Sequence, residues 1–266
     1  MLVSVVVPCY NSQNTIKNLV ELTIKEFKKM PEYTYEFVLV NDYSKDQTFL
    51  SIKELAEKYS FVKGINLARN FGQHNALMAA LNYAEGDLIV GMDDDLQTHP
   101  SQMHILLDKI KEGYDLVYGN YEKRKNSFLK NLSSKFNAVT SRILLGRPKE
   151  IVSSNYWVIT RYVRDEVIKY QNFNPYIDAL FYRCTNKIAD VTIEHHKREE
   201  GSSNYTFSKL VKLWLAYWNF SVVPLRISSF LGIIFSVCGF LGAVVTLIRQ
   251  LISPSSQIGW ASIDRK

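Results

Sequence analysis

The most constraining feature of the sequence is an uncharged apolar run near its end, from Ile227 to Ile248, bracketed by Arg226 and Arg249. A helix of about 22 residues rises roughly 33 Å, which matches the hydrocarbon core of a bilayer. The run has no polar face with which a helix on a soluble domain would meet water. We therefore predict a transmembrane helix over 226–251, with a buried core helix as the alternative.

A second helical pattern precedes this span. Apolar residues recur every three or four positions from Phe207 to Val222, and two lysines fall outside the stripe. The spacing predicts an amphipathic juxtamembrane helix over 205–225. Tryptophans on the stripe favour a helix in the membrane interface, with packing against the preceding domain as the alternative. Residues 252–266 are expected to form a tail or the start of a truncated second span.

Residues 1–204 alternate short β-branched runs with amphipathic stretches. Buried strands are predicted at Leu2–Val7, Phe37–Val40, Val62–Leu67, Asp87–Met92, Leu116–Gly119, Val152–Thr160 and Ile188–His195. Helices are predicted at Thr15–Lys29, Phe49–Ala56, His74–Ala84 and Pro100–Ile110. The alternation predicts an α/β domain whose mostly parallel, Rossmann-like sheet is covered by helices on both faces.

Polar clusters follow three of these strands, at Pro8–Asn11, Asn41–Asp46 and Asp93–Gln97. In sheets of this kind, ligands bind beyond the carboxyl ends of the strands. We therefore expect the three clusters to converge on one rim of the sheet and to form the ligand site there.

Three adjacent aspartates, Asp93, Asp94 and Asp95, repel one another unless a cation or a basic partner compensates. Strand alternation places Asp93 and Asp95 on the same side. Oxygen-only ligands suit Mg²⁺ or Mn²⁺, which bridge substrate phosphates. The cluster predicts such a metal site, with a solvated acidic turn as the alternative.

The formal net charge of +6 fits an anionic partner such as phosphate or a lipid headgroup. The segment Tyr121–Lys149 is especially basic, and a solvated helix face is the alternative to a phosphate site there. We expect no nucleic-acid partner, because the chain lacks a recognition motif.

The three cysteines form no CxxC pair, which favours a reducing compartment over a zinc or disulfide framework.

Five segments, in order along the chain, carry a family resemblance. Gly91–Pro100 contains Asp-x-Asp-Leu-Gln-x-x-Pro, and Val40–Thr48 contains Asp-x-Ser-x-Asp-x-Thr. Val3–Asn11, Arg69–His74 and the run His196–Tyr205, with Arg-x-x-Gly-x-Ser-x-Tyr, complete the set. Together they resemble the polyprenyl-phosphate glycosyltransferases of glycosyltransferase family 2, which have the GT-A fold.

The resemblance implies roles for residues of this chain. The nucleotide-sugar would contact Pro8, Tyr10, Asn11, Asp42 and Asp93, while Asp95 and Gln97, with Asp93, would hold Mg²⁺ or Mn²⁺. Arg124, Ser134 and Arg198 would bind the phosphates of donor or acceptor. The implied catalytic set is Asp93, Asp95 and Arg198.

The implied reaction is inverting, metal-dependent transfer of a sugar from a nucleotide-sugar to a polyprenyl phosphate. A phosphate monoester is largely dianionic at neutral pH, so the acceptor needs no strong base. Nucleotide-sugars are cytosolic, and Arg226 fits positive-inside placement. We therefore expect the catalytic domain on the cytoplasmic face of the inner (plasma) membrane, in contact with membrane lipids.

Two alternatives stay open. One is a family 2 transferase acting on a polysaccharide or another glycan, although the Gln-x-x-Arg-Trp string of processive synthases is absent from this sequence. The other is a non-catalytic, membrane-tethered nucleotide-sugar binding scaffold. Walker and GxGxxG loops are also absent, which argues against an ATPase and a dinucleotide enzyme.

Two further expectations concern local features. Tyr43 stands where many relatives have Gly, which predicts a different turn shape after Asp42. Within the span, small residues share one helix face, which predicts a homo-oligomer formed through close helix packing. These small residues are Gly232, Ser236, Gly239 and Ala243.

Overall fold

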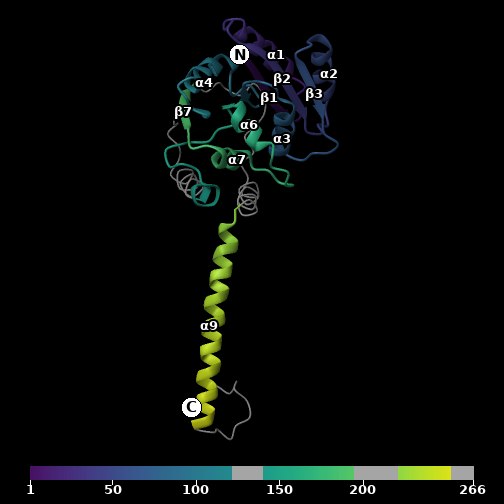
Figure 1. Ribbon diagram of the computed structural model, residues 1–266. Coiled ribbons are helices and arrows are strands. Elements are labelled where there is room, and N and C mark those ends of the chain that lie inside the picture. The colour runs from purple at the N-terminus through teal and green to yellow at the C-terminus, as the bar shows by residue number, and fades with distance from the viewer. Residues whose placement is uncertain (122–139, 195–220, 253–266) are drawn as a thin grey trace. The chain divides into compact units, whose positions relative to one another are not determined.

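The computed structural model describes residues 1–121, 140–194 and 221–252, and the chain divides into two units, Met1–Phe220 and Ser221–Lys266 (Figure 1). The described part of the second unit is one helix, α9 (Val223–Ile252), which is long and apolar enough to cross a membrane. It contains the predicted span and begins a few residues earlier. The predicted interfacial helix falls largely on residues 205–220, which lie outside the described residues.

The described part of the first unit is built on a seven-stranded sheet with the strand order β3-β2-β1-β4-β6-β5-β7. The strands are β1 (Leu2–Cys9), β2 (Thr34–Asn41), β3 (Val62–Asn66), β4 (Leu88–Gly91), β5 (Leu116–Tyr121), β6 (Trp157–Thr160) and β7 (Ile188–Ile193). Among the strands that the structure describes, only β6 runs antiparallel to its neighbours, β4 and β5. The predicted mostly parallel sheet is confirmed, and β1, β2 and β4 end at one rim.

Helices cover both faces of the sheet, as predicted. The helices are α1 (Ile16–Phe27), α2 (Thr48–Lys58), α3 (Gln73–Tyr83), α4 (Met103–Ile110), α6 (Arg161–Val167) and α7 (Ile177–Cys184), with a 3₁₀ turn, η1 (Pro100–Gln102), before α4. Alternate residues of the strands contribute to two hydrophobic cores, one on each face of the sheet. Val5 packs toward α1, α2 and α4, whereas Val6 packs toward α3, α6 and α7.

The strand predicted over Val152–Thr160 is wrong in its first half, since β6 begins at Trp157. The hydroxyl of Ser154 donates to the Gly119 carbonyl at 2.6 Å and accepts the Tyr156 N–H at 3.0 Å. These side-chain bonds take the place of ladder bonds, so the chain turns before the strand starts.

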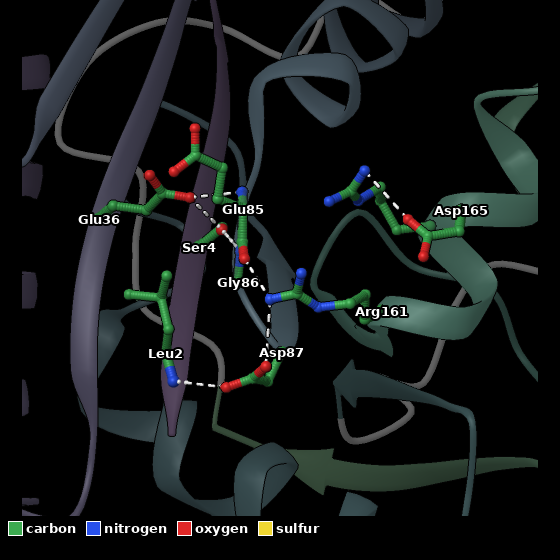
Figure 2. Close-up of polar contacts among 9 residues, drawn as sticks. Leu2, Ser4, Glu36, Glu85, Gly86, Asp87, Arg161 and Asp165 are labelled. Atoms are coloured by element: carbon green, nitrogen blue, oxygen red, sulfur yellow. Dashed lines mark hydrogen bonds and ion pairs between the residues drawn. The ribbon is translucent and has the colours of Figure 1, made fainter.

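A hydrogen-bond network ties the amino ends of β1, β2 and β4 together, at the rim opposite the polar clusters (Figure 2). The Ser4 hydroxyl donates to Glu36 Oε1 at 2.5 Å and accepts the Gly86 N–H at 2.7 Å. The Glu85 N–H also donates to Glu36 Oε1, at 2.6 Å. Beside it, Asp87 accepts the Leu2 N–H and pairs with Arg161 at 3.1 Å. The network fixes the register of the strands that carry the site.

Glu36 should make the fold sensitive to acid. Burial alone would raise the pKa of its carboxyl, but bonds from Ser4, the Glu85 N–H and Lys63 hold that pKa below the ordinary 4.5. A depressed pKa stabilises the fold above the ordinary value, and this contribution disappears as the pH falls through the folded pKa. We expect Glu36→Gln to lose about 1–2 kcal/mol of stability at pH 7 and less at pH 3, which lies below the ordinary pKa.

Chemical unfolding of the full chain in detergent at both pH values measures this difference. Glu57→Gln is the control, because Glu57 and its partner Lys53 are both exposed. An equal loss for Glu36→Gln at pH 7 and pH 3 would contradict the assignment.

Candidate active site

The predicted convergence of the polar clusters is confirmed by a cavity of about 590 Å³ at the carboxyl ends of β1, β2 and β4. The residues that line it come from five chain segments. They are Pro8, Cys9, Tyr10, Asp42, Asn70, Gly72, Gln73, Asp93, Asp94, Asp95 and Asn155. A cavity of this size suits a small molecule, and its carboxylates and amides suit polar groups.

Asp42 directly follows β2 and is 4% exposed. Its two carboxylate oxygens accept the backbone N–H groups of Phe71 and Gly72, at 2.7 and 2.8 Å. Gly72 has φ 88° and ψ 159°, a conformation open almost only to glycine, and α3 begins directly after it. Asp42 thus fixes the wall of the cavity that carries Asn70 and Gln73. Its predicted contact with the nucleotide stays a prediction.

Asn11 is turned toward the neighbouring loop. Its side-chain oxygen accepts the Lys45 N–H at 3.0 Å, and its own N–H donates to Ser44 Oγ at 3.0 Å. Asn11 and Tyr43 both have left-handed backbones, with φ 54° and 57°. Tyr43 therefore adopts a left-handed conformation that glycine adopts readily and that other residues adopt rarely.

The three aspartates have different hydrogen-bond partners. Asp93 accepts side-chain amide groups on both oxygens, Gln73 Nε2 on Oδ1 at 2.9 Å and Asn155 Nδ2 on Oδ2 at 2.7 Å. Asp94 Oδ2 accepts the Tyr10 N–H at 3.0 Å, which joins the ends of β1 and β4. Asp95 Oδ1 accepts the Gln97 N–H at 3.1 Å. The middle aspartate thus has a structural contact that the sequence did not indicate.

The carboxyl of Asp94 has a raised pKa. Burial raises this pKa and the adjacent Asp95 charge raises it further, while the hydrogen bond from the Tyr10 N–H and the nearby Ser12 hydroxyl oppose the rise. Beneath it, burial and then the Asp94 charge raise the pKa of the Cys9 thiol well above its ordinary value. A proton is therefore held more readily in this part of the rim than in water.

The donor set fits a hard divalent cation. Asp93 and Asp95 both line the cavity with carboxylate oxygens, which Mg²⁺ and Mn²⁺ prefer. No three His, Cys, Asp or Glu side chains among the described residues form a complete metal cage. A site with two protein carboxylates leaves coordination positions for substrate phosphates. Gln97 lies in the same turn, but it is not among the described residues that line the cavity.

Three predicted site residues lie outside the described residues. Arg124 and Ser134 fall within residues 122–139, and Arg198 falls within residues 195–220. Their phosphate-binding roles stay predictions.

The sequence did not indicate Asn155, because Ser153–Tyr156 matches no motif. Gln73 lies in Arg69–His74, one of the five segments that carry the family resemblance, but the resemblance implies no role for it.

The next residue, His74, accepts the Ile177 N–H at 3.5 Å, and burial lowers the pKa of its imidazole to about 4. His74 is therefore neutral at pH 7 and joins α3 to α7.

Comparisons with known proteins agree with this geometry. The family model of glycosyl transferase family 2 matches residues 4–171, which include every residue that lines the cavity. The undecaprenyl-phosphate 4-deoxy-4-formamido-L-arabinose transferase of Proteus mirabilis is 34% identical over 253 residues, covering 94% of this chain and 77% of that protein. The protein of the same name from Photorhabdus laumondii is 32% identical with the same coverage.

Solved structures share the fold. Mannosyl-3-phosphoglycerate synthase from Rubrobacter xylanophilus gives a TM-score of 0.61 at 16% identity, covering 86% of this chain and 75% of that chain. Glucosyl-3-phosphoglycerate synthase from Mycobacterium tuberculosis, in complex with Mn²⁺ and uridine-diphosphate-glucose, gives a TM-score of 0.55 at 18% identity. That match covers 80% of this chain and 74% of that chain. The fold is therefore GT-A. With the family match and the sequence relatives, we conclude that the chain belongs to glycosyl transferase family 2 and is a glycosyltransferase.

Proposed function

We propose that the protein transfers a sugar from a nucleotide-sugar to a polyprenyl phosphate, with inversion and with Mg²⁺ or Mn²⁺, at the cytoplasmic face of the inner (plasma) membrane. The observation that carries the proposal is the cavity with Asp93, Asp94 and Asp95 on one wall, in a chain that also contains α9. The names of the relatives, which are undecaprenyl-phosphate transferases, support the acceptor class. A neighbour crystallised with Mn²⁺ and uridine-diphosphate-glucose supports the donor class.

The proposed chemistry needs alignment and charge neutralisation more than a strong base. Asp95, with Asp93, would hold the cation, which when bound would stabilise the charge developing on the leaving nucleoside diphosphate. Pro8, Tyr10 and Asn70 would form the walls beside the nucleotide. Direct attack by the acceptor phosphate on the anomeric carbon inverts that centre. Outside the described residues, Arg124, Ser134 and Arg198 would bind the phosphates.

A donor screen tests the proposal. The full chain in lipid is given nucleotide-sugars, a short polyprenyl phosphate and either Mg²⁺ or Mn²⁺, and products are read by mass spectrometry. We expect one donor to give a polyprenyl-phosphate sugar, and a chelator to stop its formation. In a parallel reaction with a glycan acceptor, transfer to the glycan but not to the lipid phosphate would favour the polysaccharide alternative. No binding or consumption of any nucleotide-sugar would overturn the proposal.

Two parts of the proposal concern the second unit. The cytoplasmic placement rests on donor supply and on Arg226 at the start of the apolar run. Self-association would use the small-residue face of α9, which includes Gly232 and Gly239. Both glycines have open space where a Cβ would lie, so a second helix can approach closely there.

A further inference from the structure

We propose that Gln73 and Asn155 are positioning residues, which hold the two carboxylate oxygens of Asp93 in a clamp of neutral amides. Gln73 Nε2 lies 2.9 Å from Oδ1, and Asn155 Nδ2 lies 2.7 Å from Oδ2. Each oxygen thus accepts one amide hydrogen bond, and a carboxylate oxygen can accept more than one. The clamp sets the rotation of the carboxylate about its last bond.

Both arms of the clamp stand on anchored backbone, although their side chains are exposed. Gln73 is the first residue of α3, and the preceding Phe71 and Gly72 are held by Asp42. Asn155 lies between Ser154, whose hydroxyl bonds the Gly119 carbonyl, and the start of β6. The clamp therefore joins three elements at the carboxylate: the amino end of α3, the carboxyl end of β4 and the segment before β6.

Amides suit this position because they donate hydrogen bonds without adding formal charge. Asp93 already lies beside two other aspartates, so a fourth carboxylate in place of either amide would add repulsion. A lysine would cancel the negative charge that a divalent cation needs. Hydrogen bonds from neutral donors orient the Asp93 carboxylate without adding a compensating charge.

The order of activities among substitutions distinguishes a donor from a space-filler. Asn155→Asp keeps the shape but removes the donor and adds charge, whereas Asn155→Ala removes both shape and donor. We expect kcat/KM to fall about 10- to 100-fold in Asn155→Asp, less in Asn155→Ala, and least in Asn155→Gln, which retains an amide. A space-filling role predicts the reverse order for Asp and Ala.

Gln73→Glu and Gln73→Ala repeat this comparison on α3 and cover the case in which the Asn155 variants fail to fold. Asn82→Asp is the matched control. It adds the same charge to α3, where the amide of Asn82 bonds only the Met78 carbonyl among the contacts described, away from the cavity. We expect it to leave kcat/KM within twofold. If Asn155→Asp and Gln73→Glu are as mild as Asn82→Asp, the clamp is refuted.

A stability cycle tests the contact without any substrate, so it still reports on the clamp if the proposed transfer reaction is wrong. Asn155→Asp should lower the unfolding midpoint by about 2–4 °C when Asp93 is present. In the Asp93→Asn background, the same change should restore the midpoint, because donor and acceptor have merely exchanged places. Additive effects of the two changes, within about 1 °C, would show that these side chains do not interact.

Discussion

Asp95→Asn is expected to abolish sugar transfer, with a fall in kcat of at least about 10³-fold. Asp95 lines the cavity, and its Oδ1 accepts the Gln97 N–H. Asparagine keeps an oxygen for that bond, so the turn should survive while the negative charge is lost. Electrostatic stabilisation of a leaving group commonly contributes this much to a rate, and a neutral amide holds a divalent cation poorly.

The measurement is product formation with the donor found in the screen, at saturating and at limiting Mn²⁺. The unfolding midpoint of Asp95→Asn should lie within about 2 °C of the parent, which separates a lost function from a lost fold. Asp108→Asn is the control, since Asp108 is an exposed residue of α4 that pairs with Lys111. More than a tenth of the parent activity in Asp95→Asn would remove Asp95 from the proposed metal site.

The same variant distinguishes a catalytic cellular role from that of a non-catalytic scaffold. If the cellular role depends on transfer, Asp95→Asn should fail to complement a strain that lacks the protein. A strain rescued by Asp95→Asn would show that the chain's cellular role does not require turnover.

The position of the site could be predicted from the sequence, because parallel strands end at one rim. The strand alternation expected to place Asp93 and Asp95 on one side does not apply, because β4 ends at Gly91 and all three aspartates line the cavity. Polar residues after β1, β2 and β4 nevertheless had to meet at that rim. Such inferences need only the order of strands and helices. They do not depend on which strands are neighbours in the sheet.

The partners of these residues could not be predicted, because they depend on which strands pair. The Tyr10 N–H reaches Asp94 only because β1 lies beside β4, far along the chain. Asn155 reaches Asp93 only because β6 inserts antiparallel next to β4. No local pattern around Asn155 indicates that insertion.

The sequence also did not predict two helices, α6 and α7. α6 and α7 are short, at 7 and 8 residues, so each shows too few apolar repeats for a clear helical period. Both are needed on the face that α3 leaves open. Phe181 of α7, for example, is fully buried against that face of the sheet. Tertiary packing, more than local periodicity, accounts for these elements.

The antiparallel insertion of β6 leads to the second large expected effect, at Gly91. Gly91 pairs with Trp157 across the β4–β6 ladder. A Cβ at position 91 would lie 2.2 Å from Trp157 Cζ2 and 2.3 Å from its Cε2. The indole is 2% exposed and meets the Phe181 ring edge-to-face at 4.9 Å, so it has no free space into which to move. Glycine is required here for close approach.

We expect Gly91→Ala to destabilise the first unit by about 3 kcal/mol or more, at the upper end of overpacking effects. It should also reduce transfer, because Met92 and Asp93 follow directly and would move with the displaced strand. Unfolding in detergent and product formation measure the two effects. Gly242→Ala is the control, since a Cβ built there meets open space beyond the backbone of its own helix.

A second substitution tests the cause. Cζ2 and Cε2 both belong to the six-membered ring of the indole, so Trp157→Leu removes the atoms that clash. Trp157→Leu alone should destabilise the protein, because it leaves a cavity beside Phe181. The two changes together should cost clearly less than the sum of the single changes, with a coupling of about 1–3 kcal/mol. Additivity would mean that the alanine methyl acts elsewhere, and that β4 can shift without meeting the indole.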